Sequence, residues 1–241
     1  MKFFSFIAFT FLSFGLIAQT SAKVKYTETV SFDIPEEVRS MMRDMPSSTE
    51  IEKILNIKDN ESVYVANKED VKKEENSQGS GNRRMFFRGR SIDAILYKNI
   101  ETETQIHFKD LFEKEFLVTE EYKSYPWKIV AREQRDILGY ACMKAELKDT
   151  TNTVAWFTTQ IPLSFGPGEY HGLPGLILAL SVGEKRVILA KSVELSKDDI
   201  TIEIPSKGEK ISAEQFDKLA EEKRKEMEKM WGGNRRRMGR M

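Results

Sequence analysis

The sequence predicts a mainly β fold of the α+β class, a curved antiparallel sheet or half-barrel with an N-terminal helix and a C-terminal helix. Short apolar segments recur along residues 24–204 between polar turns, which is typical of an antiparallel meander rather than of alternating strands and helices. In several segments the apolar residues occupy every second position, as in a strand with one buried face. Helical spacing of apolar residues occurs near residues 35–45 and 212–231.

Residues 1–22 have the pattern of a secretory signal peptide. Lys2 precedes an apolar run over residues 3–18, and Thr20, Ser21 and Ala22 are the small residues that a signal peptidase reads. We expect cleavage after or near Ala22; an uncleaved anchoring helix is the alternative. No later stretch reaches the roughly 18–20 apolar residues of a membrane-spanning helix. We therefore expect an exported protein that is periplasmic or associated with the outer membrane.

The segments after this leader predict a strand, a helix and a pair of strands. Apolar residues keep to even positions over 24–34, which predicts a strand. Pro35 stands where helices favour their first residue, and a helix over 35–45 could cover the apolar face of the sheet. Residues 51–66 predict two strands that turn at Asp59 and Asn60. The charged and then Ser/Gly-rich residues 68–81 predict a mobile loop.

The centre of the chain predicts consecutive strands that complete one β domain over residues 23–205. The last of them is a regular alternation of Ile200, Ile202 and Ile204 with polar residues. The predicted strands cover residues 92–100, 105–108, 116–120, 127–131, 138–147, 153–159, 176–182, 186–195 and 200–204.

Residues 206–241 predict an amphipathic helix with a basic tail. Ser212 and Gln215 have the spacing of a capping box, and an apolar stripe that includes Phe216 and Trp231 follows among charges. Gly232 and Gly233 are expected to end the helix. Residues 234–241 contain four Arg and no acid, so they are either a solvated basic segment or a contact for an anionic partner.

Composition excludes several classes of protein. The chain of 241 residues has 38 Lys+Arg and 38 Asp+Glu, and a general nucleic-acid binder would need a basic excess. One Cys excludes an intramolecular disulfide framework and a zinc site built from cysteines, and two His leave little for a His-rich metal centre. Removal of residues 1–22 takes away one Lys and leaves a net charge of about −1.

The most specific segment covers residues 155–178. Leu173-Pro174-Gly175-Leu176 is a turn signal, because Pro presets φ at the second position and Gly permits a positive φ at the third. The chain also breaks at Gly166-Pro167-Gly168. The sequence therefore predicts a stiff, tightly turned connection from one strand into a fully apolar one.

This segment resembles the GLPGLI family of secreted Gram-negative proteins, which is named for the hexapeptide at 172–177. The resemblance implies a β domain similar to the bowl-like N-terminal domain of a type II peptide-N-glycosidase F, without established catalytic residues. It also implies an association with outer-membrane TonB-dependent transport systems. The residues that carry the resemblance, and to which we assign a structural role, are Trp127, Gly139, Tyr140, Cys142, Trp156, Pro162, Gly166, Pro167, Gly172, Leu173, Pro174, Gly175, Leu176 and Ile177.

A hidden active site is the main alternative to a purely structural segment. Cys142, His171 and Glu169 have the residue types of a nucleophile, a base and an orienting acid. Cys142 lies within a strand pattern, however, and Cys is among the residue types most often buried, so we interpret it as a core residue. Clustered methionines could bind Cu(I), but Met more often fills apolar gaps. We expect no catalytic residue, no metal and no other cofactor.

We expect a non-enzymatic binding or accessory module with an outer-membrane or other envelope protein as its partner. The candidate contacts are His171, Tyr170, Trp231, Arg235, Arg236 and Arg237. His171 either contacts a ligand beside the turn or hydrogen-bonds to a loop carbonyl. One alternative function is a carrier that holds an apolar or peptide ligand against a concave apolar face. Another is a glycan-binding accessory domain that reads sugars through Tyr125, Trp127 and Trp231.

Overall fold

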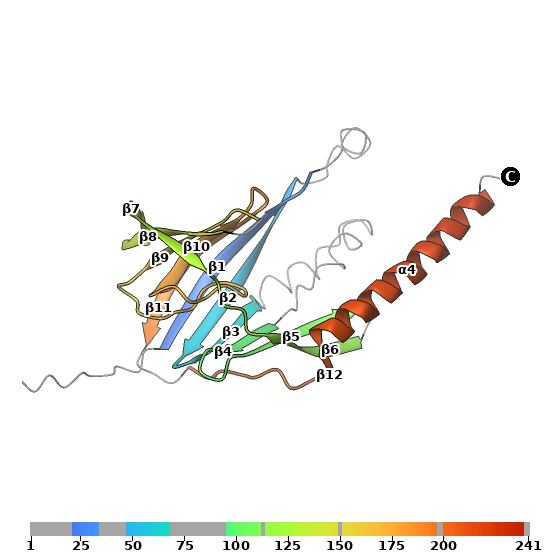
Figure 1. Ribbon diagram of the computed structural model, residues 1–241, viewed down its shortest axis with the longest axis horizontal. Helices are drawn as coiled ribbons and strands as arrows, with labels where there is room; N and C mark the ends of the chain where they lie inside the picture. The colour runs from blue at the N-terminus through green and yellow to red at the C-terminus, as the bar shows by residue number, and fades with distance from the viewer. Residues whose placement is uncertain are drawn as a thin grey trace, which may run out of the picture.

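A computed structural model describes residues 21–33, 47–67, 95–111, 114–148, 151–196 and 200–238, with side chains up to residue 226 (Figure 1). Within these residues twelve strands form one sheet, and a single helix, α4 (Ala213–Met238), follows them. The strands are β1 (Ser21–Ser31), β2 (Ser48–Lys58), β3 (Glu61–Ala66), β4 (Ile95–Asn99), β5 (Thr104–Leu111), β6 (Lys114–Glu121), β7 (Trp127–Ile137), β8 (Tyr140–Leu147), β9 (Thr153–Thr158), β10 (Leu176–Val182), β11 (Arg186–Ser196) and β12 (Glu209–Ser212). The predicted mainly β fold with a C-terminal helix is confirmed.

The sheet consists of two antiparallel meanders joined side by side. Its order is β12-β6-β5-β4-β3-β2-β1-β11-β10-β9-β8-β7, so β1 and β11 are the seam between strands 1–6 and strands 7–11. In this seam Val24 lies opposite Val193, and Ala22 lies opposite Leu195. Only β12 departs from the meander, because it pairs in parallel with β6.

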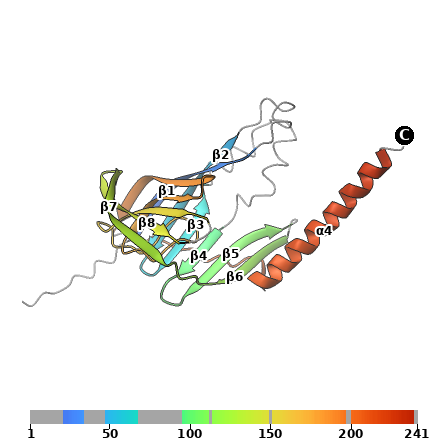
Figure 2. The same ribbon diagram turned by 45° about the horizontal axis from the view of Figure 1, so that its top comes forward.

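The connection from β6 to β7 shows that the sheet is strongly curled. Ten strand spacings separate these two strands, which amounts to about 48 Å in a flat sheet at about 4.8 Å per spacing. The strap, residues 122–126, joins them with five residues and can span at most about 23 Å, six Cα steps of about 3.8 Å. The two halves of the sheet therefore face each other at this end, as the turned view shows (Figure 2).

The concave side of the sheet is filled by the chain itself. The inner loop, residues 159–175, connects β9 to β10 and packs Ile161, Phe165 and Leu173 into the main hydrophobic core. Its backbone is bound to the start of β10, because the amides of Leu176 and Ile177 donate to carbonyls at 161 and 165. The predicted stiff connection thus folds back into the bowl.

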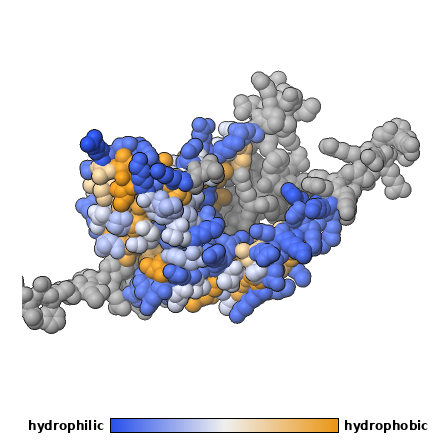
Figure 3. Space-filling model, viewed as in Figure 1, coloured by the Kyte–Doolittle hydropathy of each residue, from blue (hydrophilic) through white to orange (hydrophobic). Residues whose placement is uncertain are grey.

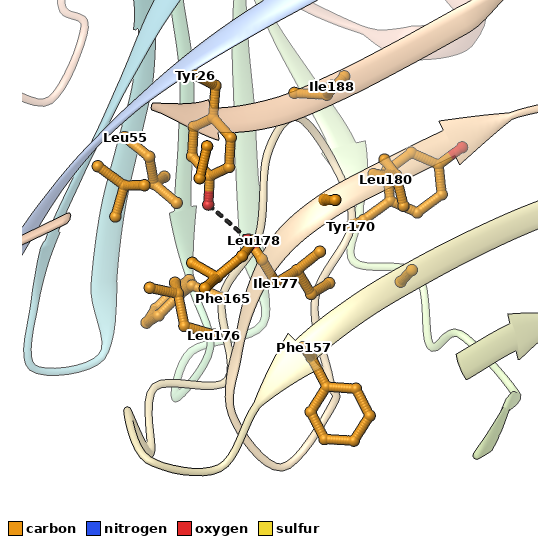
Figure 4. Close-up of a cluster of buried hydrophobic side chains, with 14 of the residues drawn as sticks. Tyr26, Leu55, Phe157, Phe165, Tyr170, Leu176, Ile177, Leu178, Leu180 and Ile188 are labelled. Carbon is orange, nitrogen blue, oxygen red and sulfur yellow. Dashed lines mark hydrogen bonds between the residues drawn. The ribbon is translucent and has the colours of Figure 1, made fainter. Parts of the chain in front are cut away.

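A buried tyrosine links the seam to the inner part of the core. The ladder between β9 and β10 shifts register between Ile177 and Ala179, and the Tyr26 hydroxyl donates to the Ile177 carbonyl at 2.6 Å (Figure 4). Figure 4 shows the labelled side chains from β1, β2, β9, β10, β11 and the inner loop around this bond. Tyr26 is fully buried, so its hydroxyl needs a partner within the protein.

The structure corrects two expectations near the C-terminus. Residues 200–206 form no strand, and Ile204 is 51% exposed. Alternation alone does not make a strand, since a strand needs a free edge, and the edge of β6 pairs with Glu209–Ser212 instead. The helix also continues through Gly232 and Gly233 to Met238. Each glycine costs only about 1 kcal/mol relative to alanine, which a long helix tolerates.

Other expectations are confirmed or lie outside the described residues. The turn at Asp59 and Asn60 joins β2 to β3. The capping box is formed, because Gln215 N–H donates to Ser212 Oγ at 3.2 Å and Ser212 N–H donates to Gln215 Oε1 at 3.1 Å. Residues 1–20 of the signal peptide predicted over 1–22, the helix over 35–45 and the loop over 68–81 lie outside the described residues, whereas Ser21 and Ala22 begin β1. Within the part of the chain that the structure describes, no helix has the length and hydropathy to cross a membrane.

Candidate functional site

Aromatic side chains gather where the strap and the start of β7 meet the inner loop. The Tyr125 ring lies 5.2 Å from the Tyr170 ring, and the Trp127 ring lies 6.2 Å from it. Tyr122 stacks on the His171 imidazole at 4.2 Å, and the Trp127 indole donates to the His171 carbonyl at 2.8 Å. Tyr170 and His171 are buried, whereas the other three are half-buried. The structure thus brings two candidate contacts, Tyr170 and His171, together with Tyr125 and Trp127, two of the three aromatics expected for a glycan site.

His171 is held as a neutral imidazole. Its Nδ1 lies 2.8 Å from the Glu169 backbone carbonyl, which can only accept, so Nδ1 carries the proton. Burial lowers the pKa of His171 to about 4, and the charge of Lys98 acts in the same direction. Its Nε2 is buried and has no hydrogen-bond partner among the described residues. His171 was expected either to contact a ligand or to hydrogen-bond to a loop carbonyl, and the structure shows the bond to the carbonyl. Its Nε2 is left as a buried acceptor.

A fully buried lysine anchors the inner loop to the sheet. Lys98, on β4, has no exposed surface, and its Nζ donates to the carbonyls of Gly168 at 2.9 Å and Tyr170 at 3.2 Å. It also lies 5.9 Å from the centre of the Phe165 ring. Burial lowers the pKa of Lys98 to about 7, and the negative charge of Glu169 offsets only part of this effect. The loop is therefore tied to β4 by a group that is only partly charged at neutral pH.

Lys98 belongs to a row of polar side chains that crosses four strands. Ser62, Lys98, Gln105 and Glu120 lie directly opposite one another along β3, β4, β5 and β6, so they share one face. Ser62 Oγ is buried without a partner among the described residues, and Gln105 is 1% exposed. His107 Nε2 lies 3.3 Å from Glu120 Oε2, and burial lowers the pKa of His107 to about 4. Both histidines of the chain thus lie near Lys98.

The concave face is therefore not the uniform apolar surface that the sequence suggested. At the seam Arg186 pairs with Glu28 at 2.8 Å, and the pKa of Arg186 is raised by this carboxylate against the opposing effect of burial. The Tyr64 hydroxyl beside them has a pKa raised mainly by burial. Strands β1, β2 and β10 carry apolar residues, while β3–β6 carry the polar row. A large apolar ligand would have to displace the inner loop and bury these charged groups.

The hexapeptide at 172–177 needs its glycines for two different reasons. Gly172 has a φ of +89°, and a Cβ there would meet no atom within 4 Å, so only its backbone conformation requires glycine. A Cβ on Gly175 would lie 2.0 Å from the Thr158 carbonyl oxygen, so Gly175 permits a close approach of two backbones. Gly166, outside the hexapeptide, instead makes room for a side chain, because the Cδ1 of Ile177 would lie 2.6 Å from an added Cβ.

Cys142 is a core residue, and its surroundings do not suit a catalytic nucleophile. It is fully buried, and its thiol donates to the Tyr140 carbonyl at 3.4 Å. Burial, together with the charge of Asp136, raises the pKa of the thiol to about 11, so almost no thiolate forms near neutrality. The ring contacts and hydrogen bonds of His171 are with Tyr122, Tyr125, Trp127 and Glu169, and none is with Cys142. The described residues thus contain no assembled Cys–His pair.

The remaining motif residues support the sheet around this core. Leu176 and Ile177 are fully buried at the start of β10. Gly139, with a φ of +81°, lies in the β7–β8 turn before Tyr140, and the Arg135 guanidinium stacks 4.6 Å from the centre of the Trp156 ring. Pro162 and Pro167 lie in the inner loop.

Helix α4 packs on the body through its first turns and then projects away from the sheet (Figures 1 and 2). The Phe216 ring meets the Phe116 ring of β6 edge to face at 5.6 Å, and Lys109 Nζ lies 5.1 Å above the Phe216 ring. Figure 3 shows hydrophilic side chains over the visible part of the helix. Trp231, Arg235, Arg236 and Arg237 lie in its distal half, far along the chain from the aromatic cluster.

Sequence reasoning missed Lys98, the cross-strand polar row and the stacking of Tyr122 on His171. One signal was available, since Leu96, Lys98 and Ile100 alternate within a predicted strand and place Lys98 on the apolar face. The hydrogen-bond partners of Lys98 lie 70 and 72 residues away in the sequence, and no local pattern predicts them. Among the described residues, no group of three or more His, Cys, Asp or Glu side chains is placed to hold a metal ion.

Comparison with known proteins supports the fold and leaves the chemistry open. A family model described as "Protein of unknown function (Porph_ging)" matches residues 145–179, which span the end of β8, all of β9, the inner loop and the start of β10. A search of curated proteins found no match. The chain is similar to PNGF-II in two crystal forms, with 17% identity and a TM-score of 0.54 in one and 15% and 0.53 in the other. These matches cover 84% and 83% of this chain. The chain spans about a third of the length of PNGF-II (33% and 32%).

Proposed function

We propose that the protein is an exported, non-enzymatic accessory module of the cell envelope, of the GLPGLI type, in which the β domain is a rigid base and α4 docks a partner. One observation carries this proposal: α4 leaves the body after its contacts at Phe216 and extends to Met238 (Figure 1). An isolated helix is only marginally stable in water, so a projecting amphipathic helix gains stability when a partner covers its apolar stripe.

The charge along α4 indicates the kind of partner. Residues 227–238 contain four basic residues and one acidic residue, while the first half is nearly balanced and internally paired, as in Lys225–Glu221 at 2.8 Å. A basic helix end favours an acidic surface on the partner and speeds association. We propose an outer-membrane protein of a TonB-dependent transport system as that partner, in line with the resemblance of the hexapeptide.

The test compares three full-length forms captured from envelope membranes of the native host after cross-linking. The parent is expected to recover one outer-membrane protein, and a variant with Arg235, Arg236 and Arg237 changed to Gln is expected to recover several-fold less. A matched control changes Lys218, Arg224 and Lys225 to Gln, which removes the same charge from the proximal half. Equal recovery by all three forms, or no outer-membrane protein in any, would overturn the proposal, provided that circular dichroism shows unchanged folds.

A glycan-binding module is the second candidate, and the aromatic cluster favours it. Tyr122, Tyr125 and Trp127 are half-buried in the strap and at the start of β7, beside Tyr170 and His171. Aromatic faces next to hydrogen-bonding groups suit a sugar ring, which has an apolar face and polar edges. Titration with oligosaccharides should then change the fluorescence of the parent and of Trp156→Phe, but not of Trp127→Phe. No binding by the parent would exclude this candidate.

A further inference from the structure

One histidine joins the strap to the inner loop. The Tyr122 ring of the strap stacks on the His171 imidazole at 4.2 Å, and the Tyr125 ring meets it edge to face at 5.2 Å. The Trp127 indole, where the strap enters β7, donates to the His171 carbonyl at 2.8 Å. The strap connects two strands that are ten spacings apart in the sheet, so His171 lies where the two halves of the curled sheet are joined.

The surroundings of the imidazole suit its neutral form. Nδ1–H donates to the Glu169 backbone carbonyl at 2.8 Å, whereas Nε2 is buried without a hydrogen-bond partner among the described residues. A second proton would sit on Nε2 and would place a positive charge in a buried site. Burial of a charge costs far more than burial of one unpartnered acceptor, so the closed arrangement disfavours the imidazolium.

The groups around the ring do not compensate for such a charge. The charged and titratable groups that face it are Lys98 from β4, Tyr122, Lys123 and Tyr125 from the strap, and Glu169 from the inner loop. The Glu169 carboxylate lies 3.9 Å from Lys123 Nζ, and burial raises the pKa of both tyrosines, which therefore stay neutral in acid. Burial and the charge of Lys98 lower the pKa of His171 to about 4, and the backbone carbonyls of Glu169 and Lys123 offset only part of this effect.

We propose that His171 is an acid-sensitive latch, whose protonation releases the strap from the inner loop. The imidazolium is stabilised by water, and the rings that cover the imidazole belong to the strap. Residues 122–126 lie outside the strands, so the strap can move away without breaking the sheet. Release would uncover the Trp127 and Tyr170 rings. The latch is independent of α4, so its failure would leave the docking function proposed for the helix untouched.

The size of the effect follows from the two pKa values of His171. A solvated histidine has a pKa of about 6.5, against about 4 in the closed arrangement. Between these values the released form binds a proton that the closed form lacks, so acidification favours release. From pH 7 to pH 4 the ratio of released to closed protein should rise about 100-fold.

Trp127 reports the release in the full chain once Trp156 and Trp231 are changed to Phe. From pH 7 to pH 4 its emission should shift to longer wavelength and its quenching by acrylamide should increase, while the far-UV circular dichroism stays constant. His171→Gln and His171→Phe should each abolish this pH dependence, and the second variant keeps a ring for Tyr122 to stack on. His107→Gln is the matched control and should retain the change, because burial also lowers the pKa of His107 to about 4.

Three results would each contradict the latch. The first is a Trp127 signal that stays constant down to pH 4, or that changes only together with the circular dichroism. The second is a transition that survives in both His171 variants, since another group would then cause it. The third is loss of the transition in His107→Gln as well, which would assign it to a general acid sensitivity of the domain.

Discussion

Lys98 makes the stability of this domain depend on pH in the alkaline range. Its pKa is about 7 in the folded protein and 10.5 when solvated. Between these values the unfolded chain holds a proton that the folded protein lacks, so the free energy of unfolding rises as the pH rises. From pH 7 to pH 9 the free energy of unfolding should rise by about 2 kcal/mol. This is a little less than the free energy of two full pKa units, because Lys98 is half-titrated at pH 7.

The informative variant is Lys98→Met, which keeps the length of the side chain and removes the titrating group. It also leaves the carbonyls of Gly168 and Tyr170 without their donor, at about 1–3 kcal/mol each, but this cost does not change with pH. Urea denaturation at pH 7, 8 and 9 measures the unfolding free energy of both proteins. Between pH 7 and pH 9 the parent should gain about 2 kcal/mol of stability relative to the variant.

An exposed lysine provides the control for this measurement. Lys128→Met, on the exposed surface of β7, should give a stability profile parallel to that of the parent. If the Lys98→Met profile were also parallel to the parent, Lys98 would titrate near its ordinary pKa. The reasoning from burial would then be refuted, because water or a counter-charge would have to reach Nζ.

Three further predictions follow from close contacts in the core and from the first strand. Gly175→Ala should lower the free energy of unfolding by about 3 kcal/mol or more, because the added Cβ would meet the Thr158 carbonyl. Gly172→Ala should lower it by about 1 kcal/mol, through the positive φ alone. Equal losses of stability in thermal denaturation would contradict the close approach at Gly175. Cys142 should react with a thiol reagent at pH 8 only at the rate of unfolding, and fast labelling of the native protein would show an accessible thiolate. The pairing of β1 moves the expected cleavage site from after Ala22 to before Ser21, because Ser21 pairs with Ser196 and Ala22 is fully buried. The mature N-terminus, measured by mass spectrometry, should therefore lie at or before Ser21, and a terminus at Lys23 would show that β1 does not need these two residues.

The strand alternation in the sequence predicted the sheet well because it reflects local burial. Val24 and Tyr26 on β1 are fully buried, as their even positions indicated. The same rule was wrong for Ile200, Ile202 and Ile204, because alternation describes what a strand would bury and not whether an edge is free to pair with it. Pairing of β12 with β6 is a tertiary fact that the alternation does not contain.

The candidate site was predictable only in part, and for a related reason. The turn residues of the hexapeptide predict a rigid connection, and this prediction identified Tyr170 and His171 beside it as candidate contacts. The residues that meet them, Lys98 and Tyr122, come from a distant strand and from the strap. Their approach depends on the curl of the whole sheet, which no segment of the sequence specifies by itself. Gly175 illustrates the same limit, because its need for glycine comes mainly from Thr158 across the ladder.

The filled interior has a consequence for where partners can bind. Because the inner loop packs Ile161, Phe165 and Leu173 into the core on the concave side of the sheet, a partner that leaves this loop in place must use the outside of the domain. Helix α4 extends from the body on that outside (Figure 2). Capture that depends on the distal arginines but not on the proximal basic residues of α4 would place the contact on the distal half of this helix. Capture that both charge variants leave unchanged would place the contact on the sheet instead.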